Sequence, residues 1–288
     1  MTAPGPRTAL CAVIGHPISH SLSPAMHNAA LRADGIDAVY LAFDVAEGRF
    51  EDAVAGLHAI GCVGVNVTLP FKDAAARIAD ERAPEVERSG AANTLVFGDR
   101  VRAFNTDVGA VTAALLELGA SAADATVLVL GAGGAARGAC RAAVEQGAAR
   151  VVISNRTLER AQRAAADLGS VAQAVPWDDR RALAAEAHLI INATSVGMDG
   201  SGSPLDHPAL DAARAGGCRA VLDLVYGAEA TPLVTAARQV GMAAGDGLAV
   251  LVHQGAEAYS LMWGRPAPIE VMRQAVQALP GHPPGPMS

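Results

Sequence analysis

Lys72 is the only lysine among the 22 basic residues of this 288-residue chain. Every other basic residue is an arginine, so arginine serves wherever the protein needs a surface cation. An amine can release its proton near neutral pH, whereas a guanidinium cannot. A single lysine could remain by chance. However, the motif Asn-Val-Thr-Leu-Pro-Phe-Lys at 66–72 places this amine where a predicted buried strand ends. We therefore interpret Lys72 as a proton donor and acceptor.

Asp107 is the second catalytic candidate, in a polar turn Asn105-Thr106-Asp107 that precedes a predicted helix over 108–118. Hydride transfer to a ketone leaves an alkoxide, so the site needs an acid within hydrogen-bond reach of that oxygen. Lys72 meets this need, with Asp107 as the partner that orients it and shares its proton. Alternatively, Asp107 is only the N-cap of that helix, as Ser23 could be for a predicted helix over 24–33.

A glycine-rich turn lies between a predicted strand over 126–130 and a predicted helix over 134–146. Its G-x-G-x-x-A spacing, in this strand-to-helix context, is typical of dinucleotide-binding sites, although a plain turn is the alternative. The first glycine permits the tight turn and the second lets the backbone approach a pyrophosphate, which the amides at the helix N-terminus then bind. The predicted cofactor-binding residues of this turn are Gly131, Ala132, Gly133, Gly134 and Ala135.

The end of the next predicted strand, over 150–154, distinguishes between cofactors. NAD-dependent enzymes usually have Asp or Glu there, which accepts hydrogen bonds from the ribose hydroxyls. This chain instead has Asn155, Arg156 and Thr157, followed one helical turn later by Arg160. Because guanidinium groups pair well with phosphates, the two arginines predict NADP with its 2′-phosphate. The alternative is a solvated helix start, with Glu159 as a neutralising neighbour.

A scaffold of parallel strands must bring these polar groups together. Apolar runs alternating with alanine-rich stretches predict βα units, with strands at 9–15, 38–43, 64–68 and 94–97 and helices at 24–33 and 47–60. A second series starts at 125 and continues with a helix at 158–168 and strands at 188–192, 220–224 and near Met242. A long helix over 247–263 and a disordered end at 280–288 follow. The predicted class is α/β with two domains and mostly parallel sheets.

The ordered motifs resemble the shikimate dehydrogenase family from about Ala12 to about Pro268. They are S-x-S-P (21–24), N-V-T-x-P-F-K (66–72), N-T-D (105–107), G-A-G-G-A (131–135), N-R-T (155–157), N-A-T-S (192–195) and G-L-x-x-L-V-x-Q (247–254). The resemblance implies an NADP-dependent oxidoreductase that interconverts 3-dehydroshikimate and shikimate in the biosynthesis of chorismate and aromatic amino acids. It also implies a discontinuous substrate-binding domain (1–107 and 247–288) and a Rossmann-like NADP-binding domain (108–246), with a cleft between them.

The resemblance further implies roles for individual residues. Two serines would bind the substrate carboxylate, Ser21 and Ser23. Five polar residues would bind the ring hydroxyls: Thr68, Lys72, Asn93, Asp107 and Gln254. Tyr226 would close over the carboxylate side. On the cofactor side, Leu224 and Gly247 would lie near the nicotinamide, and Thr194 and Ser195 would line the cofactor crevice.

Composition narrows the choice of partners. A formal net charge of -7 disfavours nucleic acid, because phosphate binding needs a basic face. The sequence contains no stretch typical of a membrane span, and residues 1–7 lack the features of a secretory signal, so we expect a cytoplasmic monomer or homodimer acting on a small molecule. The four cysteines lack paired or metal-ligand spacing, which predicts buried thiols and no metal site.

Three alternatives remain open at this point. A quinate or amino-shikimate dehydrogenase would keep the chemistry and change the substrate, and Val108 and Val250 stand where the family often has Gly and Met. A sensor that binds NADP without turnover would have no need of Lys72. A redox enzyme of folate or amino-acid metabolism would have no use for the serine pair.

Overall fold

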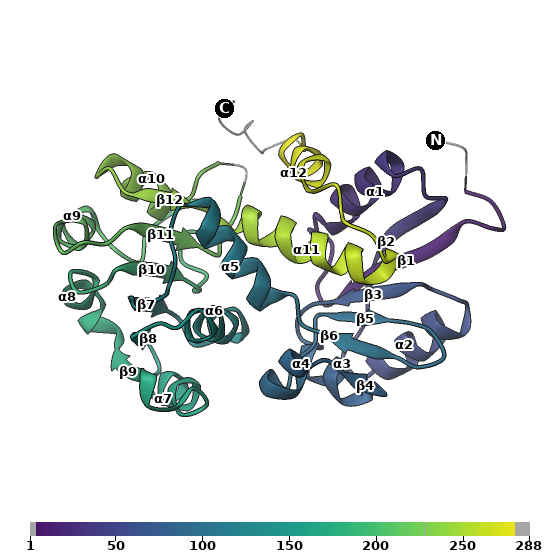
Figure 1. Ribbon diagram of the computed structural model, residues 1–288, viewed down its shortest axis with the longest axis horizontal. Coiled ribbons are helices and arrows are strands. Elements are labelled where there is room, and N and C mark those ends of the chain that lie inside the picture. Colours follow the sequence, from purple (N-terminus) through teal and green to yellow (C-terminus); the bar gives the residue numbers. More distant parts are fainter. Residues whose placement is uncertain (1–3, 228, 280–288) are drawn as a thin grey trace. The chain divides into compact units, whose positions relative to one another are not determined.

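The computed structural model describes residues 4–227 and 229–279, which form two compact units (Figure 1). The first unit runs to Thr106 and resumes at Gln254–Leu279, and the second is Asp107–His253. Helix α11 (Gly247–Trp263) carries the chain from the second unit back into the first. The predicted division into a substrate-binding domain and an NADP-binding domain stays a prediction, and the expected disordered end lies outside the described residues.

The described part of the first unit contains a six-stranded sheet with the order β2-β1-β3-β5-β6-β4. Its strands are β1 (Ala9–Gly15), β2 (Ala38–Asp44), β3 (Gly64–Val67), β4 (Glu81–Arg82), β5 (Thr94–Val96) and β6 (Arg102–Phe104). β5 runs antiparallel to both neighbours, and the other pairs are parallel. The carboxyl ends of β1, β3 and β6 therefore meet the amino end of β5 at one edge of the sheet.

Helices pack on both faces of this first sheet. The helices of this unit besides α11 are α1 (Ser23–Ala33), α2 (Phe50–Ala59), α3 (Lys72–Ile78), α4 (Pro84–Ser89) and α12 (Ile269–Gln277). One face carries Ile14, Val65 and Leu95, which form a core with α2, α3 and α4. Successive side chains of a strand point to opposite faces of the sheet, so the strand side chains between these positions face α1 and α11. Buried Tyr40 lies there, stacked against His27 of α1.

The second unit is a parallel sheet with the order β12-β11-β10-β7-β8-β9. Its strands are β7 (Thr126–Leu130), β8 (Arg150–Asn155), β9 (Ala172–Pro176), β10 (Leu189–Asn192), β11 (Ala220–Asp223) and β12 (Ala243–Gly245). The strand order reverses between β7 and β10. In open α/β sheets, ligands bind outside the carboxyl ends of the strands at such a reversal.

Two sets of helices cover this second sheet. Helices α5 (Asp107–Glu117), α6 (Gly134–Glu145) and α7 (Leu158–Ala166) pack on the face that carries Val127, Val129 and Ile191. Helices α8 (Arg180–Ala184), α9 (His207–Ala215) and α10 (Pro232–Gln239) pack on the face of Leu128 and Ile190. Short 3-10 turns at Gly169–Val171 and Trp177–Asp179 flank β9. Strands buried on both faces explain the unbroken apolar runs in the sequence.

Several predicted boundaries were wrong. Helix α5 begins at Asp107 and α1 begins at Ser23, so these two residues lie within their helices and are not N-caps. Lys72, expected in a turn, is the first residue of α3. The predicted helix over 47–60 begins only at Phe50. Elements that the sequence did not predict are short or follow turns: β4, β6, β9, α3, α4, α8, α9, α10 and α12.

Two predictions about composition can also be compared with the structure. All four cysteines are free and buried, as predicted, and burial raises the pKa of each thiol. Among the described residues, none of the helices combines the length and the apolar character needed to cross a membrane.

Candidate active site

The glycine turn between β7 and α6 requires glycine at its first position. Gly131 has φ +110°, and a Cβ added there would lie 2.8 Å from the carbonyl oxygen of Ala193. The Gly131 amide donates a 2.8 Å hydrogen bond to the carbonyl of Ser154 at the end of β8. Any other residue would be strained and would also collide with the segment after β10. The turn is thus tied to both neighbouring strands.

The N-terminus of α6 is open and free of acidic side chains. Gly133 is the N-cap residue, and Gly133, Gly134 and Ala135 are all exposed. A Cβ added to Gly133 or Gly134 would meet no atom within 4 Å, so backbone amides can be approached closely from that side. No acidic residue occupies the first turn, and the helix dipole therefore favours an anion there. These features fit the pyrophosphate of a dinucleotide.

The end of β8 presents two arginines. Asn155 shapes the corner, because its Nδ2 donates a 2.8 Å hydrogen bond to the carbonyl of Thr157, the N-cap of α7. Arg156 and Arg160 are both exposed, and neither takes part in an ion pair among the described residues. No carboxylate stands at the strand end itself. The corner thus offers two guanidinium groups to a phosphate.

A buried hydrogen-bond network fixes the segment after β10. Asn192 Oδ1 accepts hydrogen bonds from both the amide (3.1 Å) and the hydroxyl (2.7 Å) of Thr194. Asn192 Nδ2 donates to Asp223 Oδ1 at the end of β11 (2.8 Å). Ser195 is exposed just beyond. Asn192 and Asp223 were not predicted as site residues; the signal available was two polar residues ending otherwise apolar strands.

Leu224 and Gly247, which were both predicted to lie near the nicotinamide, are in contact with one another. The Gly247 amide donates to the carbonyl of Val225 (3.0 Å), and a Cβ on Gly247 would collide with the carbonyl of Leu224. Tyr226 follows, half-buried, and burial raises the pKa of its hydroxyl. Only glycine allows the first turn of α11 to approach this loop so closely.

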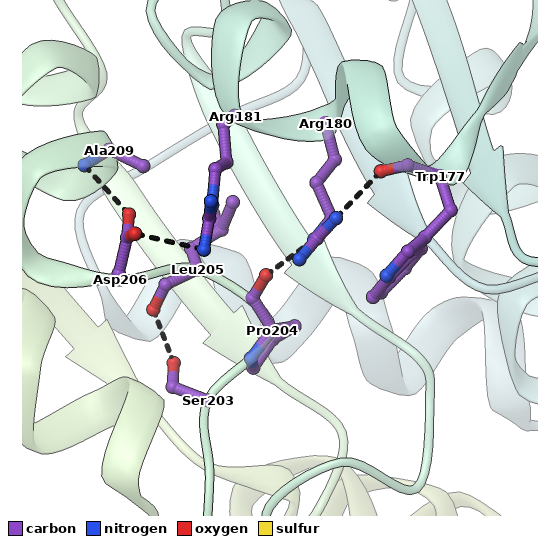
Figure 2. Close-up of polar contacts among 8 residues, drawn as sticks. All are labelled: Trp177, Arg180, Arg181, Ser203, Pro204, Leu205, Asp206 and Ala209. Atoms are coloured by element: carbon purple, nitrogen blue, oxygen red, sulfur yellow. Dashed lines mark hydrogen bonds and ion pairs between the residues drawn. The ribbon is translucent and has the colours of Figure 1, made fainter.

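Helix α8 anchors the far end of the loop between β10 and α9. Figure 2 shows the Arg180 side chain between Trp177 and Pro204. Its Nε donates to the Pro204 carbonyl (2.7 Å), its Nη1 donates to the Trp177 carbonyl (2.9 Å), and the guanidinium carbon lies 4.3 Å from the centre of the Trp177 ring. Arg181 forms a 3.0 Å ion pair with Asp206, the N-cap of α9. Both ends of this loop are therefore anchored.

The serine pair lies at the start of α1 in the first unit. The Ser23 amide donates to Ser21 Oγ (3.3 Å), and Ser23 is buried while Ser21 is half-buried. Leu22 occupies the N-cap position without a side-chain hydrogen bond, and the first amide of α1 donates instead to Ser21 Oγ.

Thr68 and Lys72 follow β3 at the polar edge of the first sheet. The Thr68 amide donates to the carbonyl of Ile14 in β1 (3.0 Å). The carbonyl of Lys72 accepts a 2.9 Å hydrogen bond from the amide of Ala92, which precedes Asn93. Lys72 is half-buried. The backbone around the amine is therefore held to both β1 and the segment that enters β5.

A buried polar chain joins Asn93 to α11. Asn93 Nδ2 donates to Thr106 Oγ1 (2.9 Å), and the Thr106 amide donates to Asn93 Oδ1 (2.9 Å). Thr106 Oγ1 donates to the carbonyl of Gln254 (3.1 Å). Asn66 continues the chain, accepting from the Tyr40 hydroxyl (2.7 Å) and donating to Thr94 (3.0 Å). Thr106, Asn66 and Tyr40 were not predicted as site residues.

The structure thus gathers the predicted site residues into two groups. One edge of the first unit carries Ser21, Ser23, Thr68, Lys72, Asn93 and Gln254. The second unit carries the glycine turn, the arginine corner, Thr194, Leu224, Tyr226 and Gly247, and Asp107 begins α5 beside Gly138 of α6. The pairing of Lys72 with Asp107 stays a prediction. Among the described residues, no group of three His, Cys, Asp or Glu side chains is arranged to hold a metal.

Family models match most of the chain in three consecutive segments. The model described as shikimate dehydrogenase substrate binding domain matches residues 13–95. Shikimate / quinate 5-dehydrogenase matches residues 113–198, and shikimate 5′-dehydrogenase C-terminal domain matches residues 247–277. The three segments follow the same order as the motifs in the sequence.

Individual relatives match over nearly the full length. Shikimate dehydrogenase (NADP(+)) of Symbiobacterium thermophilum is 42% identical, covering 98% of each chain. The structure of shikimate 5-dehydrogenase from Thermus thermophilus in complex with NADP(H) and shikimate is 37% identical, with TM-score 0.83 over 93% of this chain and 98% of that one. Quinate dehydrogenase from Corynebacterium glutamicum in complex with NAD is 27% identical, with TM-score 0.86 over 94% and 99%.

Proposed function

Because the chain belongs to the shikimate dehydrogenase family, we propose that it catalyses the reversible, NADP-dependent reduction of 3-dehydroshikimate to shikimate. This reaction is an oxidation or reduction at a CH–OH group and serves the biosynthesis of chorismate and the aromatic amino acids. The observation that carries the proposal is the polar edge of the first unit, where Asn93, Thr106 and Gln254 are joined by hydrogen bonds beside Thr68 and Lys72. A polyhydroxylated ring needs such a concentration of polar groups.

Substrate binding in this proposal uses two kinds of contact. Ser21 and Ser23 bind the carboxylate, and Tyr226 closes over the same side. The ring hydroxyls are bound by Thr68, Lys72, Asn93, Asp107 and Gln254. Burial of Asn93 supports its assignment, because a buried amide that is already oriented by Thr106 loses little freedom on binding.

Lys72 supplies the proton in the proposed reaction. The glycine turn would hold the pyrophosphate of NADPH, and the bound cofactor would supply the hydride for the carbonyl carbon. The ammonium of Lys72 gives its proton to the oxygen that becomes the hydroxyl, and Asp107 orients the amine and shares the proton. In the reverse direction, the neutral amine accepts the hydroxyl proton. The hydrogen bond from Ala92 to the Lys72 carbonyl supports this role, since it fixes the backbone from which the amine extends.

Cofactor selection is assigned to the arginine corner. We expect Arg156→Ala to raise the Kd for NADP by about 10- to 100-fold, because it removes charge-assisted hydrogen bonds to the 2′-phosphate. The Kd for NAD, which lacks that phosphate, should stay within about twofold by the same reasoning. Fluorescence titration of both cofactors measures the two values. Arg163→Ala removes an arginine from the helix that follows the corner, α7, and serves as control. An equal loss of NAD affinity in Arg156→Ala would contradict the assignment.

Quinate is the second substrate to be tested, because the chain is also similar to a quinate dehydrogenase. We expect a higher kcat/KM for shikimate than for quinate, and for NADP than for NAD, in an absorbance assay of cofactor reduction. The serine pair and the absence of an acid at the cofactor corner support this order. A higher kcat/KM for quinate would reject the shikimate assignment. NADPH binding without any oxidation by 3-dehydroshikimate would instead indicate a sensor.

The setting of the enzyme is part of the same proposal. We place it in the cytoplasm, as a monomer or a homodimer that acts on a small molecule without a nucleic-acid or membrane partner. The acidic net charge supports the exclusion of nucleic acid. Sedimentation analysis at working concentration would distinguish the two oligomeric states.

A further inference from the structure

Asp223 is a fully buried carboxylate that touches three hydrogen-bond donors at the end of β11. Its exposed fraction is 0%. A buried charge is costly unless hydrogen-bond donors contact its oxygen atoms. Oδ1 accepts from Asn192 Nδ2 (2.8 Å) and from the Val225 amide (3.0 Å). Oδ2 accepts from the Thr231 hydroxyl (2.7 Å). Burial raises the pKa of Asp223, and these hydrogen bonds oppose that rise.

The carboxylate determines which way the Asn192 amide points. A carboxylate only accepts hydrogen bonds, so Asn192 must direct its NH2 group toward Asp223. The amide oxygen then faces the other way, where it accepts from the amide and the hydroxyl of Thr194. Asn192 Nδ2 also donates to the Val196 carbonyl (3.4 Å), so the same NH2 group joins Asp223 to the segment that follows Thr194. The carboxylate of Asp223 thus holds Asn192, and through it Thr194, in one position.

The Asp223 carboxylate is linked by hydrogen bonds to both segments that border the proposed nicotinamide site. Residues 193–196 begin with Ala193, whose carbonyl lies against Gly131, and Thr194 Oγ1 accepts from the Val196 amide (3.2 Å). On the other side, the Asp223 carboxylate holds the Val225 amide, while the Leu224 carbonyl packs against Gly247. One buried group therefore sets the backbone of two neighbouring loops.

We propose that Asp223 is a positioning residue for hydride transfer, which orients Asn192 and thereby holds residues 193–196 and 224–226 where the nicotinamide of NADPH must be seated. This inference rests on the proposed function. The position of the reacting ring depends on these loops, and a misplacement of about 1 Å at a reacting centre can lower a rate about 100-fold. The adenosine end of the cofactor, assigned to the arginine corner after β8, does not depend on them.

The test separates positioning from general weakening of the unit. We expect Asp223→Ala to lower kcat/KM for NADPH by about 10- to 100-fold and to change the primary deuterium isotope effect measured with 4-deuterated NADPH. Asp223→Asn, which keeps one acceptor for Asn192 and Val225 but removes the charge, should fall between this variant and the parent. Binding of 2′,5′-ADP, which occupies the adenosine end alone, should stay within about twofold in both.

His188→Ala is the matched control. His188 Nδ1 accepts from the Thr126 amide (2.9 Å) at the amino ends of β10 and β7, whereas Asp223 lies at the carboxyl end of β11. Loss of the His188 side chain should therefore lower Tm without changing kcat/KM or the isotope effect. Parent-like kcat/KM in Asp223→Ala would overturn the proposal, and so would a loss of 2′,5′-ADP affinity in proportion to the loss of activity. If Asp223→Ala does not fold, Asp223→Asn and Thr231→Val decide by the same measurements. Failure of the parent enzyme to reduce 3-dehydroshikimate would reject the proposed function instead, and the ratio of NADPH to 2′,5′-ADP affinity would still test Asp223.

Discussion

Replacing Lys72 with arginine is expected to lower kcat for 3-dehydroshikimate reduction by about 10²- to 10⁴-fold, the range typical of lost general acid–base catalysis. Arginine keeps the positive charge and can still donate hydrogen bonds to a ring oxygen. It cannot release its proton near neutral pH, so only proton transfer is removed. Lys72→Ala should show a similar loss of kcat and, in addition, a raised KM for the substrate. Steady-state rates with NADPH and 3-dehydroshikimate measure both effects.

The control for this prediction lies on the same short helix. Arg77 of α3 is exposed, and Arg77→Ala should leave kcat within about twofold, as surface substitutions usually do. Both Lys72 variants should bind NADPH with unchanged Kd, because the proposed cofactor contacts lie in the second unit. A Lys72→Arg variant that keeps most of its kcat would show that the amine does not transfer the proton.

His27 is expected to make the protein sensitive to acid. Its ring is buried and stacked on the Tyr40 ring with centroids 4.1 Å apart, and both ring nitrogens lack a hydrogen-bond partner within the described part of the chain. Burial lowers the pKa of His27 to about 3, from an ordinary value near 6.5. The unfolded chain therefore binds a proton at mildly acid pH that the folded chain excludes.

The direction of the effect follows from the lowered pKa. The contribution of neutral His27 to the free energy of unfolding is fully present above pH 6.5 and falls as the pH decreases toward 3. Between pH 7 and pH 4.5 the protonation of this single group in the unfolded chain should lower the free energy of unfolding by about 2 to 3 kcal/mol. Urea unfolding followed by circular dichroism at several pH values measures the loss. The carboxylates add their own pH dependence, so the relevant quantity is the difference between variants.

His27→Phe keeps an aromatic ring against Tyr40 and cannot be protonated. Between pH 7 and pH 4.5 we expect its free energy of unfolding to decrease by about 2 to 3 kcal/mol less than that of the parent, whatever its absolute stability. His207→Gln removes an exposed histidine of α9 that is paired with Asp211, and it should change the pH dependence by less than about 1 kcal/mol. Equal pH dependence in the parent and in His27→Phe would show that the ring accepts a proton in the folded state.

The elements around the glycine turn could be predicted from the sequence almost to the residue. Strand β7 and the start of α6 were predicted correctly, and β8 and α7 differ from the predictions only at their ends. The signals for these elements are local. Strands buried on both faces form continuous apolar runs, and the glycines stand where the backbone must turn and approach its neighbours. The cofactor motif shares this local character, so its residues could be identified from spacing alone.

The first unit was harder to predict for a physical reason. Its missing elements, such as α3, α4 and β6, are only three to seven residues long, and helices of this length are not stable by themselves. These short elements form because their apolar side chains are buried in the core between the sheet and its helices. The sequence therefore indicates a turn at Lys72. Tertiary packing stabilises the short helix α3, of which Lys72 is the first residue.

The sequence by itself determined the α/β class, the glycine turn and the arginine corner, and it predicts Lys72 as the reactive amine. Each of these depends on residue types and on spacing within a few positions. Tertiary structure alone decided the buried polar networks that join Asn93 to Thr106 and Asn192 to Asp223. Their members are 13 and 31 positions apart in the sequence. Such partners meet only when neighbouring strands adopt one register, and that register is set by the packing of whole faces rather than by any local pattern.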